Sequence, residues 1–422
     1  MSFLGMREKT FASTAVGLPW GAWYEEATHR LPLPPAWQVD LLEPADAPAW
    51  ERTRVEAALA APIGGSPLAE LARGRRTASI VVDDLARPTR AADVLPTLLD
   101  QLERAGVNRS RITVLVATGT HGTLTPQQIR RKLGPEVAKT VRVEVHDPHT
   151  STAPTGVRYG KKPLRVNRTF LESELKITVG CVLPHSFAGY SGGAKLVLPG
   201  LADVAATARS HKFVEMGLRG GQDPNENRFR LEIEQLARQL GLSYTVCVVP
   251  NSRREAAGVF AGDLVAAHRE ACRMAARAYA TPLRETYDCV VLNAYPKDID
   301  LVQAGNALVA LKTARAPVVH EEGVLLVATA ASEGLGRHGL FAPGGASYRA
   351  PRPKRALGRR ELWLYAPGVT EADARQLHWE GYPFFRDAAA VCEALAERFP
   401  GPARAAVLPC APMQQIDDRR TP

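Results

Sequence analysis

The feature that most constrains the fold of this chain is a regular alternation of short apolar runs with longer amphipathic segments. The short runs are rich in β-branched residues, as buried strands are. They cover residues 79–82, 112–117, 141–145, 177–182, 244–249, 289–292, 324–328, 362–365 and 405–408. In the segments 91–105, 262–280 and 386–399, apolar residues recur every three or four positions, which indicates helices. Alternating strands and helices predict an α/β fold with mostly parallel sheets.

The length of 422 residues predicts more than one domain, since a domain averages about 150 residues. The predicted helix that ends near residue 280 is followed by Thr281-Pro282, after which a new strand begins. We therefore place a boundary at about residue 280, between a larger N-terminal α/β domain (1–280) and a smaller C-terminal α/β domain (281–422). The stretch 334–360 is rich in Gly, Pro and Arg and predicts a long loop.

Several classes of protein are excluded by composition. No run of about 18 apolar residues is present, so we expect no transmembrane helix and no membrane partner. The first residues lack the apolar segment of a signal peptide. The six cysteines are scattered and form no CxxC pair, which predicts a reduced, cytoplasmic protein.

The net charge of +9 raises the question of nucleic-acid binding. The longest basic clusters, within 73–76 and 352–360, are short and contain no aromatic residues. We therefore expect no nucleic-acid partner, and a mild positive field suits small anionic substrates equally well.

Ligands of α/β proteins bind beyond the carboxyl ends of the strands, so the residues that follow each predicted strand are informative. Asp84 and Arg87 follow the run 79–82. The planar guanidinium of Arg87 suits a substrate carboxylate, although a helix-capping Asp beside an exposed Arg explains the pattern as well. His121 lies between small residues after the run 112–117, where it suits either a ligand site or a surface loop.

The densest polar stretch follows the run 177–182, and it reads PHSFAGYSGGAK. It contains His185 and, ten residues later, Lys195. Its small residues leave backbone amides available for a phosphate. These residues are Ser191, Gly192 and Gly193. The spacing is not that of a Walker A motif. His211 lies sixteen residues beyond Lys195 and is unremarkable by itself.

A polar pair follows the run 289–292. Gln303 and Asn306 are three residues apart, so on a helix they share one face. An ordinary loop with exposed polar residues explains them as well.

Taken together, these motifs resemble the nickel-pincer-dependent lactate racemase family. The segments that carry the resemblance are DDLARPT, ATGTHGTLT, VGCVLPHSFAGYSGGAKLVLPG and YPKDIDLVQA, together with the spaced His211. The resemblance runs from about residue 18 to about residue 311 and fades beyond about residue 320. It implies two α/β domains with an active-site cleft between them.

The resemblance also implies a cofactor. In this family a pyridinium mononucleotide grips nickel between two sulfur arms, and a lysine forms a thioamide with one arm. Lys195 matches that lysine, and His211 matches the histidine that completes the nickel coordination. Asp84 and the Ser191, Gly192 and Gly193 cluster are the remaining cofactor-site candidates. The family also requires partner enzymes that make the cofactor.

The reaction implied is racemisation or 2-epimerisation of a 2-hydroxy acid through a planar 2-keto acid, with hydride leaving and returning on opposite faces. His121 and His185 match the two family histidines that act as opposed acid and base. Arg87 matches the arginine that binds the substrate carboxylate. Gln303 matches a glutamine of the substrate site, with Asn306 beside it.

The sequence departs from the family next to that glutamine. The family commonly has Tyr and Lys where this chain has Val302 and Asn306. Loss of the cation puts lactate in doubt and favours a larger substrate, such as a sugar acid or an aromatic hydroxy acid. Two other interpretations remain open: a dehydrogenase- or dehydratase-like reaction with the same cofactor, and a non-catalytic nucleotide-binding protein.

Overall fold

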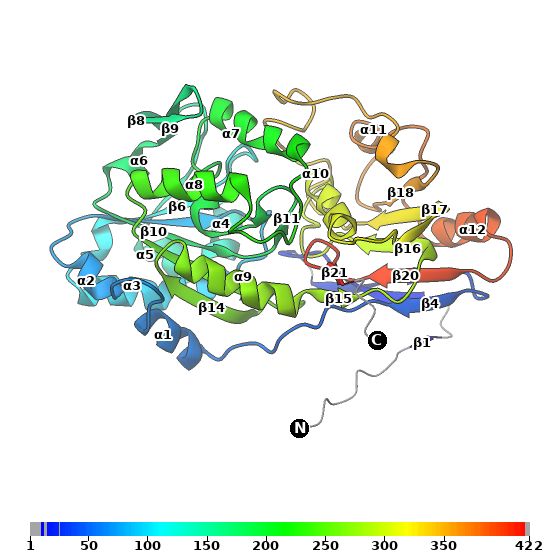
Figure 1. The fold of residues 1–422 in the computed structure, drawn as a ribbon, viewed down its shortest axis with the longest axis horizontal. Coiled ribbons are helices and arrows are strands. Elements are labelled where there is room, and N and C mark those ends of the chain that lie inside the picture. Colours follow the sequence, from blue (N-terminus) through cyan, green and yellow to red (C-terminus); the bar gives the residue numbers. More distant parts are fainter. Residues whose placement is uncertain (1–9, 12–14, 25, 418–422) are drawn as a thin grey trace. The chain divides into compact units, whose positions relative to one another are not determined.

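The computed structural model describes residues 10–11, 15–24 and 26–417. It divides into two compact units, each built on one large sheet (Figure 1). The six-stranded unit comprises Ala45–Ala280 and Arg337–Arg349. The seven-stranded unit comprises the described residues up to Pro44, then Thr281–Gly336 and the described residues from Ala350 onward.

The six-stranded sheet is parallel except for one edge strand. In spatial order its strands are β14 (Ala256–Gly262), β13 (Tyr244–Pro250), β10 (Leu175–Cys181), β5 (Ala78–Asp83), β6 (Ile112–Ala117) and β7 (Arg142–Val145). Only β14 runs antiparallel to its neighbour. The chain builds outward from β5 to β7, then returns to β10 on the other side of β5. The topological switch point, where α/β proteins bind ligands, therefore lies between β5 and β10.

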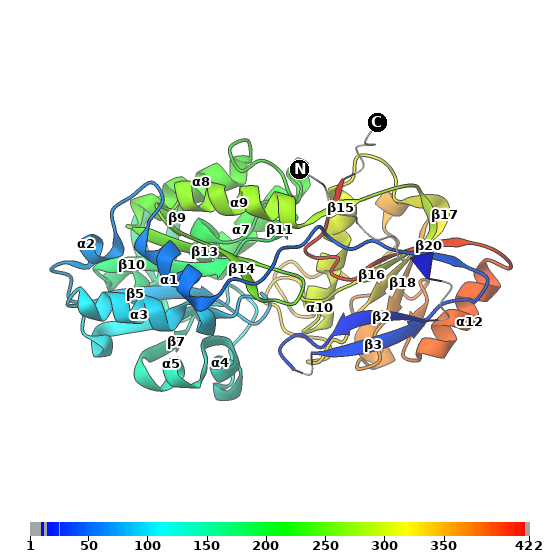
Figure 2. The same ribbon diagram turned by 90° about the horizontal axis from the view of Figure 1, so that it is seen from below.

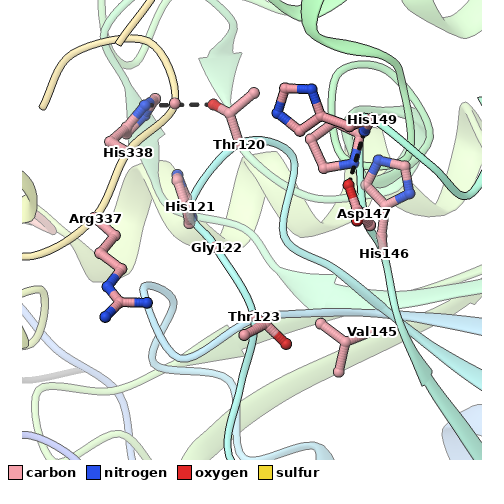
Figure 3. Close-up of a pocket in the computed structure, with 12 residues that line it drawn as sticks. Thr120, His121, Gly122, Thr123, Val145, His146, Asp147, His149, Arg337 and His338 are labelled. Atoms are coloured by element: carbon pink, nitrogen blue, oxygen red, sulfur yellow. Dashed lines mark hydrogen bonds between the residues drawn. The ribbon is translucent and has the colours of Figure 1, made fainter. Parts of the chain in front are cut away.

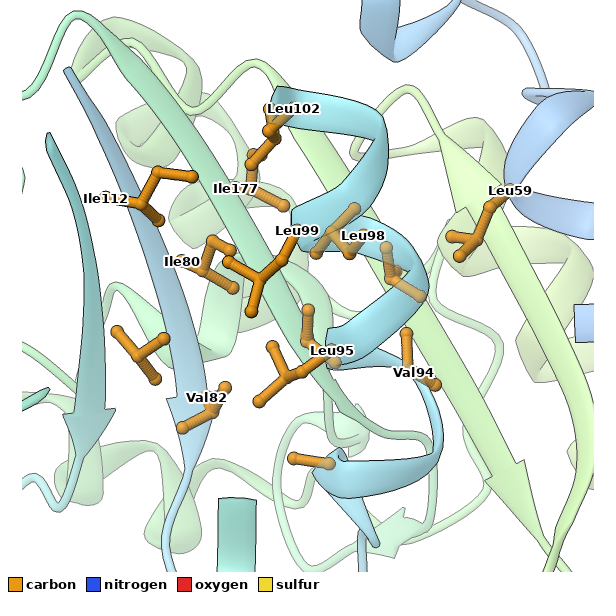
Figure 4. Packing of buried hydrophobic residues seen from close by; sticks show 14 of the residues in the cluster. Leu59, Ile80, Val82, Val94, Leu95, Leu98, Leu99, Leu102, Ile112 and Ile177 are labelled. Atoms are coloured by element: carbon orange, nitrogen blue, oxygen red, sulfur yellow. The ribbon is translucent and has the colours of Figure 1, made fainter. Parts of the chain in front are cut away.

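Alternating side chains of these strands enter two cores, as the two-residue period of a strand requires. Ile80 and Val82 pack with one set of helices, and Figure 4 shows them against Leu95 and Leu99 of α3. These helices are α1 (Arg52–Ala60), α2 (Leu68–Ala72), α3 (Leu95–Arg104), α4 (Pro126–Leu133) and α5 (Pro135–Thr140). Val81 points the other way, into a core formed with α6 (Arg168–Glu172), α7 (Val204–His211) and α8 (Arg228–Gln239). Helix α9 (Ala266–Ala278) packs on β13 and β14 (Figure 2).

Two small hairpins complete this unit, and short 3-10 helices are scattered along the chain. The hairpins are β8 (Thr152–Tyr159) with β9 (Lys162–Asn167) and β11 (Pro184–His185) with β12 (Gly189–Tyr190). The 3-10 helices are η1 (Ala91–Asp93), η2 (Arg109–Arg111), η3 (Gly193–Leu196), η4 (Lys212–Met216), η5 (Gly305–Lys312) and η6 (Arg355–Leu357).

The seven-stranded sheet is also mostly parallel. Its strands in spatial order are β1 (Thr10–Phe11), β4 (Gln38–Leu41), β20 (Arg404–Leu408), β16 (Tyr287–Asn293), β17 (Val319–Ala328), β18 (Glu361–Tyr365) and β19 (Phe384–Phe385). Only the pair β1–β4 is antiparallel. The other elements are β2 (Ala15–Trp20), β3 (Ala27–Pro32), β15 (Ala280–Pro282), β21 (Gln415–Asp417), α10 (Leu301–Ala304), α11 (Glu371–Ala374) and α12 (Ala388–Arg398).

The α/β class with mostly parallel sheets is confirmed, and each predicted strand is present with small changes at its ends. The units differ from our division into 1–280 and 281–422 in two segments. The described residues up to Pro44 belong with the C-terminal part because β4 pairs with β20, and Arg337–Arg349 belongs with the earlier part. No helix in the described part of the chain is long and apolar enough to cross a membrane.

Candidate active site

The predicted site residues of the six-stranded unit follow the carboxyl ends of its central strands. Asp84 and Arg87 come directly after β5, His121 follows β6, and His185 follows β10. These strands are neighbours in the order β10-β5-β6. Their loops therefore meet at the edge of the sheet that holds the switch point, where the motif analysis expected the chemistry.

Asp84 and His121 form a close pair. The Nδ1 atom of His121 lies 2.6 Å from Oδ2 of Asp84. Because an ionised carboxylate only accepts hydrogen bonds, Nδ1 carries a proton, and in the neutral ring Nε2 keeps its lone pair. Burial alone would raise the pKa of Asp84, but His121, Arg87 and Lys132 outweigh burial and lower the pKa below its ordinary value. The arrangement makes Nε2 of His121 a proton acceptor.

The buried Lys132 contacts the backbone of the segment that carries Asp84. The Lys132 ammonium lies 2.5 Å from Oδ1 of Asp83 and donates to the carbonyl oxygens of Asp84 and Arg87 at 2.9 and 3.2 Å. The other oxygen of Asp83 accepts from the Cys181 amide of β10 at 3.0 Å. The loop after β5 is thus fixed both to α4 and to the next strand. No motif of the sequence distinguishes Lys132 from the other basic residues of α4.

His185 has the opposite kind of support. It lies on β11, is buried, and its Nδ1 accepts a hydrogen bond from the Ala188 amide at 3.4 Å. The neutral ring therefore carries its proton on Nε2. Its ring also meets the Phe187 ring edge-on, with 4.7 Å between centroids.

His211 ends helix α7 and is positioned as a neutral ligand. Its Nδ1 lies 2.8 Å from the Thr207 carbonyl oxygen, which can only accept, so the lone pair is on Nε2. Burial, together with the charges of Lys195, His121 and Arg87, lowers the pKa of His211 to about 4, although the hydrogen bond to Thr207 opposes the shift. Lys195 is half-buried on η3 in the same unit.

A continuous series of rings joins the three predicted histidines. Centroids are 4.7 Å apart between His185 and Phe187, 5.3 Å between Phe187 and His211, 6.4 Å between His211 and His338, and 4.9 Å between His338 and His121. His338 lies in the 334–360 stretch, which was predicted to be a long loop. It is buried here, and its Nδ1 accepts from the Leu340 amide at 3.1 Å.

The small-residue cluster after β10 is held by partners within the chain. The Ser191 hydroxyl donates to the Cys181 carbonyl at 2.6 Å and accepts from the Leu183 amide at 2.9 Å. Gly192 and Gly193 have φ of 80° and 57°, a conformation that favours glycine. These contacts give the cluster a structural reason, and its role in holding a nucleotide phosphate stays a prediction.

Gln303 and Asn306 belong to the seven-stranded unit, after β16. The Gln303 amide donates to Asp300 Oδ1 at 2.7 Å, which caps α10. Asn306 Nδ2 donates to the Gln303 carbonyl at 2.8 Å and lies 3.3 Å from Gln303 Oε1. The two side chains therefore share one face, as predicted from their spacing, and their role at a substrate stays a prediction.

A cavity of about 330 Å³ borders His121 in the six-stranded unit (Figure 3). In that view Arg337 and His338 lie on one side of the 120–123 segment, and His146 and His149 lie on the other. In the described part of the chain, no three His, Cys, Asp or Glu side chains form a metal-binding group.

Comparison with known proteins gives consistent matches. Residues 24–219 match the family model of the lactate racemase N-terminal domain. The chain is 29% identical over 302 residues to a lactate racemase of Thermoanaerobacterium thermosaccharolyticum, covering 69% of this chain and 68% of the relative. It is also 29% identical over 299 residues to a lactate racemase of Lactiplantibacillus plantarum, covering 69% of each.

Solved structures share the fold. The lactate racemase apoprotein of Thermoanaerobacterium thermosaccharolyticum matches with a TM-score of 0.73 at 22% identity, covering 96% of this chain and 100% of that one. A protein of Thermotoga maritima matches with a TM-score of 0.66 at 15% identity, covering 89% and 100%.

Proposed function

This chain belongs to the lactate racemase family and is an isomerase, and from that premise we propose that it racemises or 2-epimerises a 2-hydroxy acid. His121 and His185 are the proposed opposed acid and base, Arg87 binds the substrate carboxylate, and Lys195 and His211 hold a nickel-pincer nucleotide. The observation that carries the proposal is the ring series that joins His121, His211 and His185 within one unit.

The residues present suit such a cofactor. His211 offers a neutral Nε2 lone pair, the form in which imidazole binds metals. Lys195 offers a half-buried amine in the same unit, and its charge is one of the causes that lower the pKa of His211. The lack of a three-residue metal group among the described residues agrees with a metal whose other donors come from the cofactor itself. When bound, the nucleotide supplies the hydride acceptor and donor.

The protein residues then move protons and hold the substrate. Arg87 pairs with the carboxylate and fixes the orientation of carbon 2. Nε2 of His121 removes the hydroxyl proton of one enantiomer as the C2–H bond breaks, which leaves a planar 2-keto acid. His185, in its imidazolium form, would protonate the oxygen of the keto acid from the opposite side and become neutral. The other enantiomer uses the same two groups with the roles exchanged.

Two further residues enter the proposal on the family resemblance alone. Gln303 and Asn306 are retained as substrate-binding candidates, and Asn306 in place of the family lysine favours a substrate other than lactate. Asp84 acts through His121, since its carboxylate fixes the proton on Nδ1.

The test is the intact mass of the chain co-produced with the cofactor maturation enzymes, followed by peptide mapping. We expect a nucleotide-sized adduct with nickel on the Lys195 peptide, absent from the Lys195→Arg control. The loaded enzyme should interconvert the enantiomers of a 2-deuterated hydroxy acid and retain the label in the product.

Other outcomes distinguish the alternatives. A loaded chain that consumes the hydroxy acid without forming its mirror image indicates a dehydrogenase- or dehydratase-like reaction. An unmodified chain, obtained where a known racemase is loaded in the same host, contradicts the covalent cofactor and favours simple nucleotide binding.

A further inference from the structure

The cavity beside His121 has no role in the chemistry described so far. Its walls come from the loop after β6, the turn after β7 and the 337–339 segment (Figure 3). His121 and His338 line one part of it, so it opens directly beside the proposed base. A substrate whose hydroxyl reaches His121 is therefore well placed to extend a side chain into this space.

The size of the cavity exceeds what lactate requires. Its volume is about 330 Å³. The methyl group of lactate is close in size to one water molecule, which occupies about 30 Å³ in the liquid. Small-molecule sites begin at about 300 Å³. The cavity therefore accommodates a side chain of several heavy atoms.

Two of the polar side chains that line the cavity already have hydrogen-bond partners within the chain. The carboxylate oxygens of Asp147 accept hydrogen bonds within their own turn, from the His149 amide at 2.8 Å and from the Thr150 hydroxyl at 2.7 Å. Both ring nitrogens of His146 are also occupied, by the Ala202 carbonyl at 3.1 Å and the Ser151 hydroxyl at 3.1 Å. Neither side chain is available as the main partner of a ligand.

Arg337 is different. Its side chain lies against Gly122, where an added Cβ would meet the Arg337 Cβ at 3.6 Å. No carboxylate pairs with it among the residues that the structure describes. A guanidinium presents paired donors that match a carboxylate or a phosphate. Arg337 is therefore a cation at the wall of the cavity that can pair with an anionic group of a ligand.

Resting on the proposed function, we propose that this cavity receives the distal part of a 2-hydroxy acid that ends in a second anionic group, and that Arg337 pairs with that group. The substrate class is then a 2-hydroxy dicarboxylate or a phosphorylated hydroxy acid. Arg87 holds the carboxylate next to the reacting carbon, and Arg337 selects the far end.

The experiment compares the loaded enzyme with its Arg337→Gln variant on malate, 2-hydroxyglutarate, gluconate and lactate. Arg349→Gln is the matched control, because Arg349 is an exposed arginine of the same segment. We expect the Arg337→Gln variant to lose about tenfold to a hundredfold in kcat/KM for the two dicarboxylates. Activity on lactate and on gluconate should stay within about twofold, and Arg349→Gln should change neither.

Three results overturn the proposal. One is equal loss on lactate and the dicarboxylates. Another is loss of the Lys195 adduct in Arg337→Gln, which would assign the anion to the nucleotide phosphate instead. The third comes from titration calorimetry of malate with the loaded protein, which needs no turnover: an unchanged Kd in Arg337→Gln would show that this arginine does not read the ligand. A loaded wild-type enzyme that is inactive on every 2-hydroxy acid contradicts the proposed function itself, whereas activity on lactate with no role for Arg337 contradicts only this inference.

Discussion

The loops after β6 and β10 hold the same side chain in opposite tautomers. His121, after β6, donates from Nδ1 to the Asp84 carboxylate and keeps a lone pair on Nε2. His185, after β10, accepts at Nδ1 from the Ala188 amide and keeps a proton on Nε2. The difference comes from the neighbours and not from the histidines. In these tautomers Nε2 of His121 is a base, and His185 becomes the acid once its ring is protonated to imidazolium.

The surroundings of the two histidines differ in the same sense. Beneath His121 lie the charged groups Asp83, Asp84 and Lys132, all buried and paired. Beside His185 lies Phe187, which itself packs edge-on against Phe229 at 5.0 Å. The first loop is held by electrostatics and the second by aromatic packing, so different substitutions should disturb them.

The largest expected effect comes from Asp84→Asn. The asparagine amide can donate to Nδ1 of His121, which moves the ring proton to Nε2 and removes the base. A substitution of this kind behind the histidine of a serine protease costs about 10⁴-fold in kcat, and we expect a loss of about that order here. The measurement is kcat of the loaded enzyme, with the Lys195 adduct checked by intact mass. Activity within tenfold of wild type would contradict the role given to Asp84.

Replacing each histidine in turn tests the comparison directly. His121→Gln and His185→Gln should each lower racemisation by about 10²- to 10⁴-fold. In a single turnover, each variant should still oxidise the enantiomer whose hydroxyl proton goes to the histidine that remains. The two variants should therefore have opposite enantiomer preferences in stopped-flow measurements. The same preference in both would show that the histidines are not opposed.

The charged loop should be sensitive to loss of its buried cation. Lys132→Met leaves Asp83 without its partner, and breaking a buried ion pair costs about 3–5 kcal/mol in the free energy of unfolding. Urea denaturation measures it. Lys139→Met is the control, since Lys139 is exposed, pairs with Glu136 at 3.5 Å, and should change stability by less than about 1 kcal/mol. Equal effects of the two substitutions would show that the buried Lys132–Asp83 ion pair does not stabilise this loop.

The lowered pKa of Asp84 should also make the stability of the fold depend on pH. The folded pKa of Asp84 lies below its unfolded value, so its ionised form stabilises the fold above the unfolded pKa. That stability is lost as the pH falls through the folded pKa. The difference in unfolding free energy between wild type and Asp84→Asn should therefore be largest above about pH 4 and shrink at lower pH. Parallel curves throughout would contradict the pKa shift.

Features that are encoded by contiguous residues could be predicted from the sequence, whereas contacts between residues far apart in the chain could not. Strands such as β5 and β6 were predicted because apolar runs and the motifs after them are contiguous in the chain. The pairing of β4 with β20 was not, because strands so distant in sequence leave no local trace of their contact. Lys132 was not predicted because it follows two other basic residues in a helix that has the sequence of an exposed one. Its pairing with Asp83 joins segments far apart in the chain. His338 was missed because only the folded 337–349 segment brings it beside His121.

The smallest expected effect is on the aromatic side of the comparison. Phe187 lies between His185 and His211, with centroid distances of 4.7 and 5.3 Å. Phe187→Leu keeps an apolar side chain but removes these edge contacts, each worth about 0.5–1.5 kcal/mol.

We expect Phe187→Leu to slow oxidation of the enantiomer that depends on His185 by about twofold to tenfold. Oxidation through His121 should be less affected, because His121 is held by Asp84 and touches no part of this ring series except His338. Single-turnover rates for the two enantiomers provide the measurement, and the nickel content of the protein shows whether His211 has been disturbed. If both rates fall together while nickel is retained, the two loops are not independent, and the contrast between an electrostatic and an aromatic support does not govern the proton transfers.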